Sequence, residues 1–329
     1  MENITQDKLL LFAENAQIIK KEFALQSTQT KRLAALLYAQ ANKAIDCEAI
    51  RKCYTLIKQN TGMFSAFRGD MALGVAALLS LSSIPQEMFD ETLKVYDLLK
   101  DVKLRASNFL TVAAYQIASQ ADASEYENVI ARTRDFYDGM KADHFFYTGQ
   151  DDYIFAAMLG LSGLAAETGT KQIEHIFSHL KDEFWDNNSV QALAQVLVLG
   201  DTDDAENRVL VLRDALRAQK IKLDKSYTLS MLGVLALLPV DIDTIVHDME
   251  DAQTMLRNQK GFGSLSIGTQ ELLMFAASLV ADKHTQNAKD GVLTATVSTS
   301  IINIIIAQQA AMIAAISASS AAAASSTSS

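Results

Sequence analysis

Acidic side chains placed just before apolar segments are the residues of this chain best suited to acid–base chemistry. Asp151 and Asp152 are adjacent, and Asp70 occupies a similar position before another apolar segment. Paired carboxylates act as general acid and base when their surroundings separate their pKa values. The same carboxylates could instead cap the helices that follow, because a helix N-terminus favours negative charge. We favour capping and keep Asp70, Asp151 and Asp152 as candidate catalytic residues.

Aromatic and basic side chains accompany these acids and could bind a ligand. They lie in the stretches 62–70, 144–153, 184–189 and 261–271. The candidate binding residues are Phe64, Arg68, His144, Tyr147, Tyr153, Trp185, Phe262 and Glu271. Because each stretch precedes an apolar segment of a repeat, we expect these residues to gather at one end of a helical array.

His175 and His179 are candidate metal ligands, because they are four residues apart and share one face of a helix. Glu183 follows four residues later on the same face, and zinc accepts imidazole and carboxylate ligands. The pair lacks the glutamate of the H-E-x-x-H motif, so we favour histidines that face solvent. The glycines of 261–268 follow no strand and lack the lysine of a phosphate loop. The sequence therefore predicts no cofactor.

The run Asp201-Thr202-Asp203-Asp204 matches the D-x-D-D acid motif of class II terpene cyclases, which are α/α toroids. In those enzymes the motif leads into an inner helix, whereas here it follows an apolar segment and precedes an amphipathic one. This chain also has a single tryptophan, whereas those enzymes have Trp-rich repeats. We therefore expect Asp203 to form a capping box with Glu206.

Recurring segments rich in Ala, Gly, Ser and Leu must position all of these side chains. They begin 37 to 45 residues apart, at Leu33, Met71, Phe109, Tyr153, Val190, Tyr227 and Leu272. Amphipathic segments alternate with them, near 6–25, 46–59, 86–103, 124–141, 170–184, 203–219 and 241–258. A period near 40 residues is typical of helix pairs that stack. The pattern predicts an all-α fold of about seven helix pairs, as a tightly curved α-solenoid or a closed α/α toroid, and we favour the toroid.

Capping residues agree with this register. Ser124 with Glu127 has the spacing of a capping box, and Asp241 is a further N-cap candidate.

Composition excludes several classes of protein. The chain of 329 residues has 29 Lys+Arg and 39 Asp+Glu, a net charge of −10, which argues against a nucleic-acid partner. Two prolines and 14 glycines are too few for a turn-rich β fold. The two cysteines make no disulfide framework, so we expect a reduced, cytoplasmic protein.

The last segment differs from the rest, because residues 291–329 carry no charge and end in Ser/Ala repeats. We predict a helical-repeat domain over 4–285, a linker and apolar tail helix over 286–316, and a disordered tail over 317–329. Asn303, Gln308 and Gln309 interrupt the apolar run, and polar residues are unfavourable in lipid. We therefore expect the tail helix to dock on the domain, with membrane anchoring through 293–316 as the alternative.

Three segments of the chain are distinctive. They are Thr148–Tyr153 leading into Ala156–Leu159, Leu79–Pro85 before Tyr96–Lys100, and Ala307–Ile316. These segments resemble an uncharacterised family of Gram-positive bacteria that is catalogued as a domain of unknown function. The resemblance covers nearly the whole chain. It implies one self-contained, all-helical architecture and assigns no catalytic residue.

On these grounds we expect a non-enzymatic binding or scaffold protein that uses the concave face of its array for a protein or a small molecule. One alternative is a toroid enzyme, cyclase-like or glycosidase-like, with Asp151 and Asp152 as acid and base. Another is a tail-anchored membrane protein.

Overall fold

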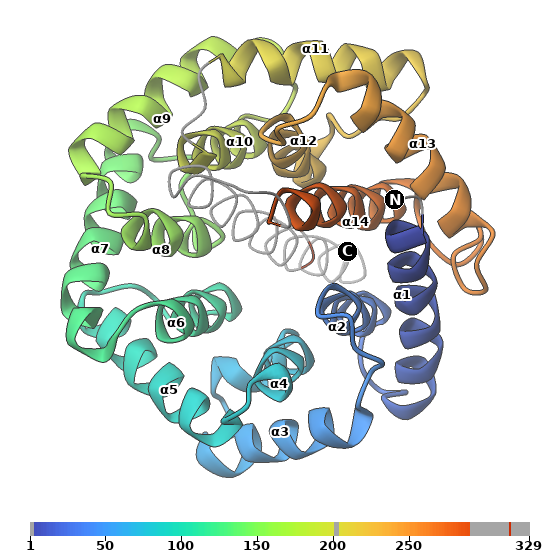
Figure 1. Cartoon of the computed structure of the whole chain (residues 1–329). Coiled ribbons are helices and arrows are strands. Elements are labelled where there is room, and N and C mark those ends of the chain that lie inside the picture. The colour runs from blue at the N-terminus through green and yellow to red at the C-terminus, as the bar shows by residue number, and fades with distance from the viewer. Residues whose placement is uncertain (1–2, 201–203, 290–315, 317–329) are drawn as a thin grey trace, which may run out of the picture. The chain divides into compact units, whose positions relative to one another are not determined.

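The computed structural model describes residues 3–200, 204–289 and 316, and the fold of these residues is all-α (Figure 1). Seven amphipathic helices are α1 (Asn3–Glu22), α3 (Cys47–Asn60), α5 (Pro85–Asp101), α7 (Tyr126–Asp143), α9 (Ala166–Leu180), α11 (Ala205–Ala218) and α13 (Ile242–Arg257). Seven more apolar helices alternate with them, α2 (Thr28–Gln40), α4 (Ala72–Leu81), α6 (Asn108–Gln120), α8 (Tyr153–Leu161), α10 (Asn187–Gly200), α12 (Leu229–Ala236) and α14 (Thr269–Lys289). No strand occurs among the described residues, so the predicted all-α class is confirmed.

The helices belong to two compact units. Unit I comprises residues 11–139 and 148–166, and unit II comprises residues 3–10, 140–147, 167–200 and 204–289. A closed toroid stays a prediction.

Each unit is built of two layers of helices. In unit I the apolar helices α2, α4, α6 and α8 form a row, and α3 and α5 pack against it (Figure 1). In unit II the corresponding row is α10, α12 and α14, and it is covered by α11 and α13. The amphipathic helices bury one stripe, such as Phe89, Val95 and Leu99 of α5, all fully buried. The layering follows because neither kind of helix can bury its apolar surface alone.

Side chains of the amphipathic helices also bind the carbonyls at the ends of the apolar helices. Arg132 Nε donates to the Gly160 carbonyl at 2.8 Å, and Arg208 Nε donates to the Ala236 carbonyl at 2.6 Å. Asn15 Nδ2 donates to the Lys43 carbonyl at 3.1 Å, just after α2. Each of these pairs is 28 residues apart in the sequence. The contact satisfies backbone acceptors that a helix C-terminus leaves without an intrahelical partner.

The predicted caps had different outcomes. Asp241 is the N-cap of α13, and its Oδ1 accepts a hydrogen bond from the Thr244 N–H at 2.8 Å. Ser124 does not cap α7, because it lies inside a 3₁₀ turn over Ala123–Glu125 and α7 begins only at Tyr126. Asp201 and Asp203 lie outside the described residues, as does the predicted tail from residue 290 onward apart from Ile316. Residues 286–289 of the predicted linker belong to α14. Ile316 is helical and fully buried.

None of the helices in the described part of the chain combines the length and the apolar character needed to cross a membrane.

Ion pairs fix α14 within unit II. Asp248 of α13 contacts Lys283 Nζ at 2.7 Å and His284 Nε2 at 2.6 Å, and Lys8 of α1 pairs with Asp282. Lys8 and Asp282 are both about 95 % buried. A buried charge is stable only when it is paired, so these contacts fix the position of α14.

Gly160 is expected to tolerate no side chain. A Cβ there would lie 2.4 Å from Thr133 Oγ1 and 2.9 Å from the Val129 carbonyl oxygen of α7. We expect Gly160→Ala to lower the free energy of unfolding by about 2 kcal/mol, measured by urea denaturation, because the helix backbones must move apart. Gly62→Ala is the control, since nothing lies within 4 Å of its Cβ, and it should change stability by less than about 0.5 kcal/mol. Equal effects of the two substitutions would contradict close packing of α8 on α7.

Asp248 makes unit II sensitive to acid. Burial alone would raise the pKa of this carboxyl, but the hydrogen bonds from His284 and Lys283 outweigh burial and hold the pKa below the ordinary value for aspartate. The stabilisation is therefore complete above the unfolded-state pKa and is lost as the pH falls through the lower folded-state pKa. We expect Asp248→Asn to cost about 2 kcal/mol at pH 7 and to flatten the loss of stability below about pH 4 in urea titrations.

The control for this prediction is Asp251→Asn on the same helix. Asp251 is 63 % exposed and lies 3.6 Å from the exposed His247. Its substitution should leave the free energy of unfolding within about 0.5 kcal/mol of wild type, both at pH 7 and below about pH 4. A wild-type pH profile in Asp248→Asn would show that this carboxylate does not stabilise unit II.

Candidate functional site

A groove of about 770 Å³ lies in unit II between α9 and α11. Its apolar lining comes from Ile176 of α9, from Leu197 and Val198 in the last turn of α10, and from Ala205. Its polar lining is Thr168, Lys171, Gln172, His175, His179, Asp204, Glu206 and Asn207. The groove thus joins an apolar surface to a wall of charged and hydrogen-bonding groups.

Two histidines and one glutamate meet in this wall. His179 Nδ1 lies 2.7 Å from Glu206 Oε2, and His175 Nε2 lies 4.0 Å from Glu206 Oε1. The two imidazole rings are 4.2 Å apart, centroid to centroid. One ligand atom from each of the three side chains lies within 4.8 Å of the others, as a shared metal ion requires.

Helix α9 presents the two histidines beside its buried stripe. Ile173, Phe177 and Leu180 are at most 4 % exposed and attach the helix to the core. His175 and His179 lie at the flank of this stripe, and their side chains are 65 % and 58 % exposed. Their exposure agrees with the preference for solvent-facing histidines.

Helix α11 brings Glu206 to the histidines from its first turn. Asp204 precedes the helix with φ of 61°, a left-handed conformation that aspartate adopts more readily than most residues. Glu206 is an acidic residue in the first turn, where the helix dipole favours a carboxylate. Glu206 pairs with His179.

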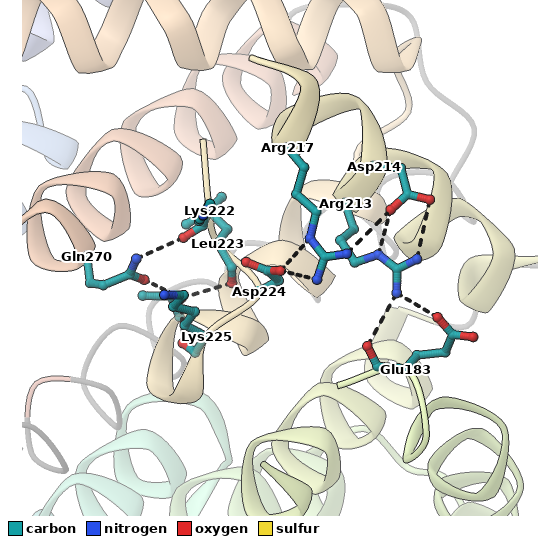
Figure 2. Close-up of polar contacts among 10 residues, drawn as sticks. Glu183, Arg213, Asp214, Arg217, Lys222, Leu223, Asp224, Lys225 and Gln270 are labelled. Carbon is teal, nitrogen blue, oxygen red and sulfur yellow. Dashed lines mark hydrogen bonds and ion pairs between the residues drawn. The ribbon is translucent and has the colours of Figure 1, made fainter. Parts of the chain in front are cut away.

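A second set of contacts holds α11 to the turn that follows α9 (Figure 2). Arg213 Nη1 donates to Glu183 Oε2 at 2.8 Å, and Arg213 Nε donates to Asp214 Oδ1 at 2.8 Å. The hydrogen bond with Asp214 raises the pKa of Arg213, and the same bond lowers the pKa of Asp214. Arg217 continues the network to Asp224, with an Nε–Oδ2 distance of 2.6 Å. Glu183 is therefore engaged by Arg213 and does not complete the predicted set with His175 and His179.

The predicted acids of unit I occupy different environments. Asp152 is 4 % exposed, and its Oδ2 accepts a hydrogen bond from the Gly149 N–H at 2.8 Å, which closes the loop before α8. Asp151 is half-buried, and Asp70 is exposed. Burial, Tyr153 and Asp152 together raise the pKa of Tyr137 to about 12, so this phenol is neutral at pH 7.

Several predicted binding residues belong to the packed interior. Phe262 is 1 % exposed and Tyr153 is 2 % exposed, and the Tyr153 hydroxyl accepts a hydrogen bond from the Arg105 N–H at 3.1 Å. Arg68 donates from Nη2 to the carbonyls of Lys58 and Thr61. These side chains stabilise loops and the core.

Other predicted residues are grouped or exposed. His144 and Tyr147 both pack on Phe177, with ring centroids 4.0 Å and 6.0 Å away. His144 Nε2 lies 2.5 Å from Glu174 Oε2. Trp185 is fully exposed.

Two residues remain from the predicted binding set. Phe64 of unit I is 98 % exposed. Glu271 of unit II is half-buried. Burial, together with the negative charge of Glu271, raises the pKa of Tyr227.

Glu206 is the site residue that the sequence did not single out. The prediction assigned it to a capping box, because Asp203 precedes it at the right spacing. The available signal was the repeat itself, which makes consecutive amphipathic helices neighbours. That signal does not specify which residues of the two helices meet.

Layered helices with a groove between two amphipathic helices define an all-helical protein. The chain belongs to the family described as "Protein of unknown function (DUF4003)", whose profile matches residues 15–311. This match confirms the predicted resemblance to a family of unknown function, and the Gram-positive origin stays a prediction. No curated protein and no solved structure matches the chain.

Arg213 is expected to stabilise the contact between α9 and α11. Its side chain is 10 % exposed and bridges Glu183 and Asp214. We expect Arg213→Met to lower the free energy of unfolding by about 1–2 kcal/mol in urea denaturation at pH 7, because two charge-assisted contacts are lost. Arg51→Met is the control, since Arg51 makes a similar 2.9 Å pair with Glu22 but is 53 % exposed. It should change stability by less than about 0.5 kcal/mol, and an equal loss in both variants would contradict the assigned role.

Proposed function

We propose that the protein is a binding protein and that its ligand occupies the groove between α9 and α11. The observation that carries the proposal is the combination of volume and lining. A volume of about 770 Å³ falls in the range of about 300–1,000 Å³ typical of small-molecule sites. Such sites combine apolar surface for affinity with a few polar groups for orientation.

The lining favours a small amphipathic ligand. Ile176, Leu197 and Val198 would contact its apolar body. Lys171, His175 and Glu206 would orient its polar end. The protein's net charge of −10 does not by itself select an anionic or a cationic ligand, because the polar wall contains both signs.

This proposal keeps the predicted binding role and moves it from the concave face of an array to a groove between two amphipathic helices. A scaffold role for the concave face of the array stays a prediction. The enzyme alternative is not favoured, because the carboxylate of Asp152 is engaged by the Gly149 N–H.

The groove can be tested with the fluorescent probe 1-anilinonaphthalene-8-sulfonate, which has an apolar body and one anionic group. We expect saturable binding of one probe per folded chain, measured by fluorescence titration. Ile176→Gln should weaken this binding about tenfold, because it removes apolar contact area in the groove without changing charge or length greatly. Circular dichroism would establish that the variant is folded.

The control is Ile18→Gln, which changes an isoleucine of α1 that is 44 % exposed and lies outside the groove. It should bind the probe as wild type does. Absence of saturable binding, or equal binding by the two variants, would contradict the proposed site.

A further inference from the structure

We propose that His175, His179 and Glu206 form a zinc site in the wall of the groove. The inference uses the groove of the proposed function, but the metal site can exist whether or not the groove also holds an organic ligand. It assigns a chemical role to two exposed histidines and a carboxylate that no contact in the core requires.

The spacing of the ligand atoms supports a single shared ion. Four ligands at about 2.0–2.2 Å from tetrahedral zinc lie about 3.3–3.6 Å from one another. The distances of 2.7 Å from His179 Nδ1 to Glu206 Oε2 and of 4.0 Å from His175 Nε2 to Glu206 Oε1 bracket that range. Because the side chains are 58 %, 65 % and 25 % exposed, small rotations can equalise these distances without disturbing the core.

The two helices are held in place independently of the metal. His175 and His179 are fixed relative to each other by one helix, since residues four apart lie on one face. Helix α11 is held to the turn that follows α9 by the Arg213–Glu183 pair (Figure 2). The site therefore needs little ordering of the backbone when a metal binds, which favours affinity.

The donor atoms select the class of metal. Two imidazole nitrogens and one carboxylate oxygen suit zinc and neighbouring transition metals, whereas magnesium and calcium prefer oxygen ligands alone. His179 Nδ1 lies 2.7 Å from Glu206 Oε2, and zinc would bind between these two atoms. His179 would then be in the tautomer that carries its proton on Nε2.

Three protein ligands leave a fourth position on a tetrahedral ion. All three ligands line the groove, so this position opens toward it. A water molecule would occupy it in the absence of a ligand. A carboxylate or another oxygen of a groove ligand would replace that water.

The rest of the histidines provide internal comparisons. His144 and His284 are 9 % and 6 % exposed and contact Glu174 and Asp248, respectively. His247 is 73 % exposed and lies 3.6 Å from Asp251 of the same helix. His247 is the matched control, because it is an exposed His–carboxylate pair without a second histidine.

In the test, the full-length protein is treated with a chelator and dialysed. It is then titrated with Zn²⁺ in an isothermal titration calorimeter. We expect one Zn²⁺ per chain and no comparable binding of Mg²⁺. His175→Gln, His179→Gln and Glu206→Gln should each weaken zinc binding at least about tenfold, whereas His247→Gln should bind as wild type does. Zinc should also raise the melting temperature of wild type more than that of these three variants, because it binds only the folded chain.

Weak or non-stoichiometric zinc binding, or binding that the three substitutions leave unchanged, would overturn the metal site and leave the residues as an interhelical ion pair. The naphthalene probe separates this failure from failure of the proposed function. Ile176→Gln should weaken probe binding but retain zinc binding, whereas Glu206→Gln should lose zinc. Loss of zinc binding alone would leave the groove intact, and loss of probe binding alone would leave the metal site intact.

Discussion

Close packing between the apolar and amphipathic layers is the constraint on which the rest of the structure depends. Gly160 shows its extent, because even a methyl group would lie 2.9 Å from a backbone carbonyl oxygen of α7. Small residues allow this approach, and the amphipathic helices can then bury their stripes completely, as α5 does. The polar groups at the helix ends follow the same geometry. The carbonyls bound by Arg132, Arg208 and Asn15 lie 28 residues further along the chain in each case. The separation is the same because the two helices of each pair are arranged in a similar way.

The layering also determines which side chains can meet at the surface. Within a unit, neighbouring amphipathic helices lie beside one another, so side chains near the end of one helix reach the next helix. Glu22 with Arg51 and Glu183 with Arg213 are examples, 29 and 30 residues apart. His179 and Glu206 make a contact of the same kind at 27 residues. The contact between α9 and α11 lies in a groove. Within the described residues, it is also the only such contact in which a second histidine approaches the carboxylate.

The positions of the helices could be predicted from the sequence because the spacing of apolar residues within one segment is enough to indicate each helix. Helices α8 and α13 match their predicted segments within one residue at the start, whereas α9 begins at Ala166, four residues before the predicted 170. The candidate site was less predictable. Phe262 and Arg68 look like ligand-binding residues in a loop, but a buried aromatic ring and an arginine bound to carbonyls have the same sequence signature. Glu206 requires knowledge of the relative positions of two helices, which periodicity does not contain.

The pairing of Lys8 with Asp282 has a consequence for the order in which the chain is made. These residues are 274 positions apart, and unit II contains segments from both sides of unit I. During synthesis the helices of unit I emerge before most of unit II, so unit I can fold before Asp282, which pairs with Lys8, has been made. The first turns of α1 join their unit only when α14 leaves the ribosome. The ion pair between Lys8 and Asp282 can therefore form only after all the helices of unit I have been synthesised.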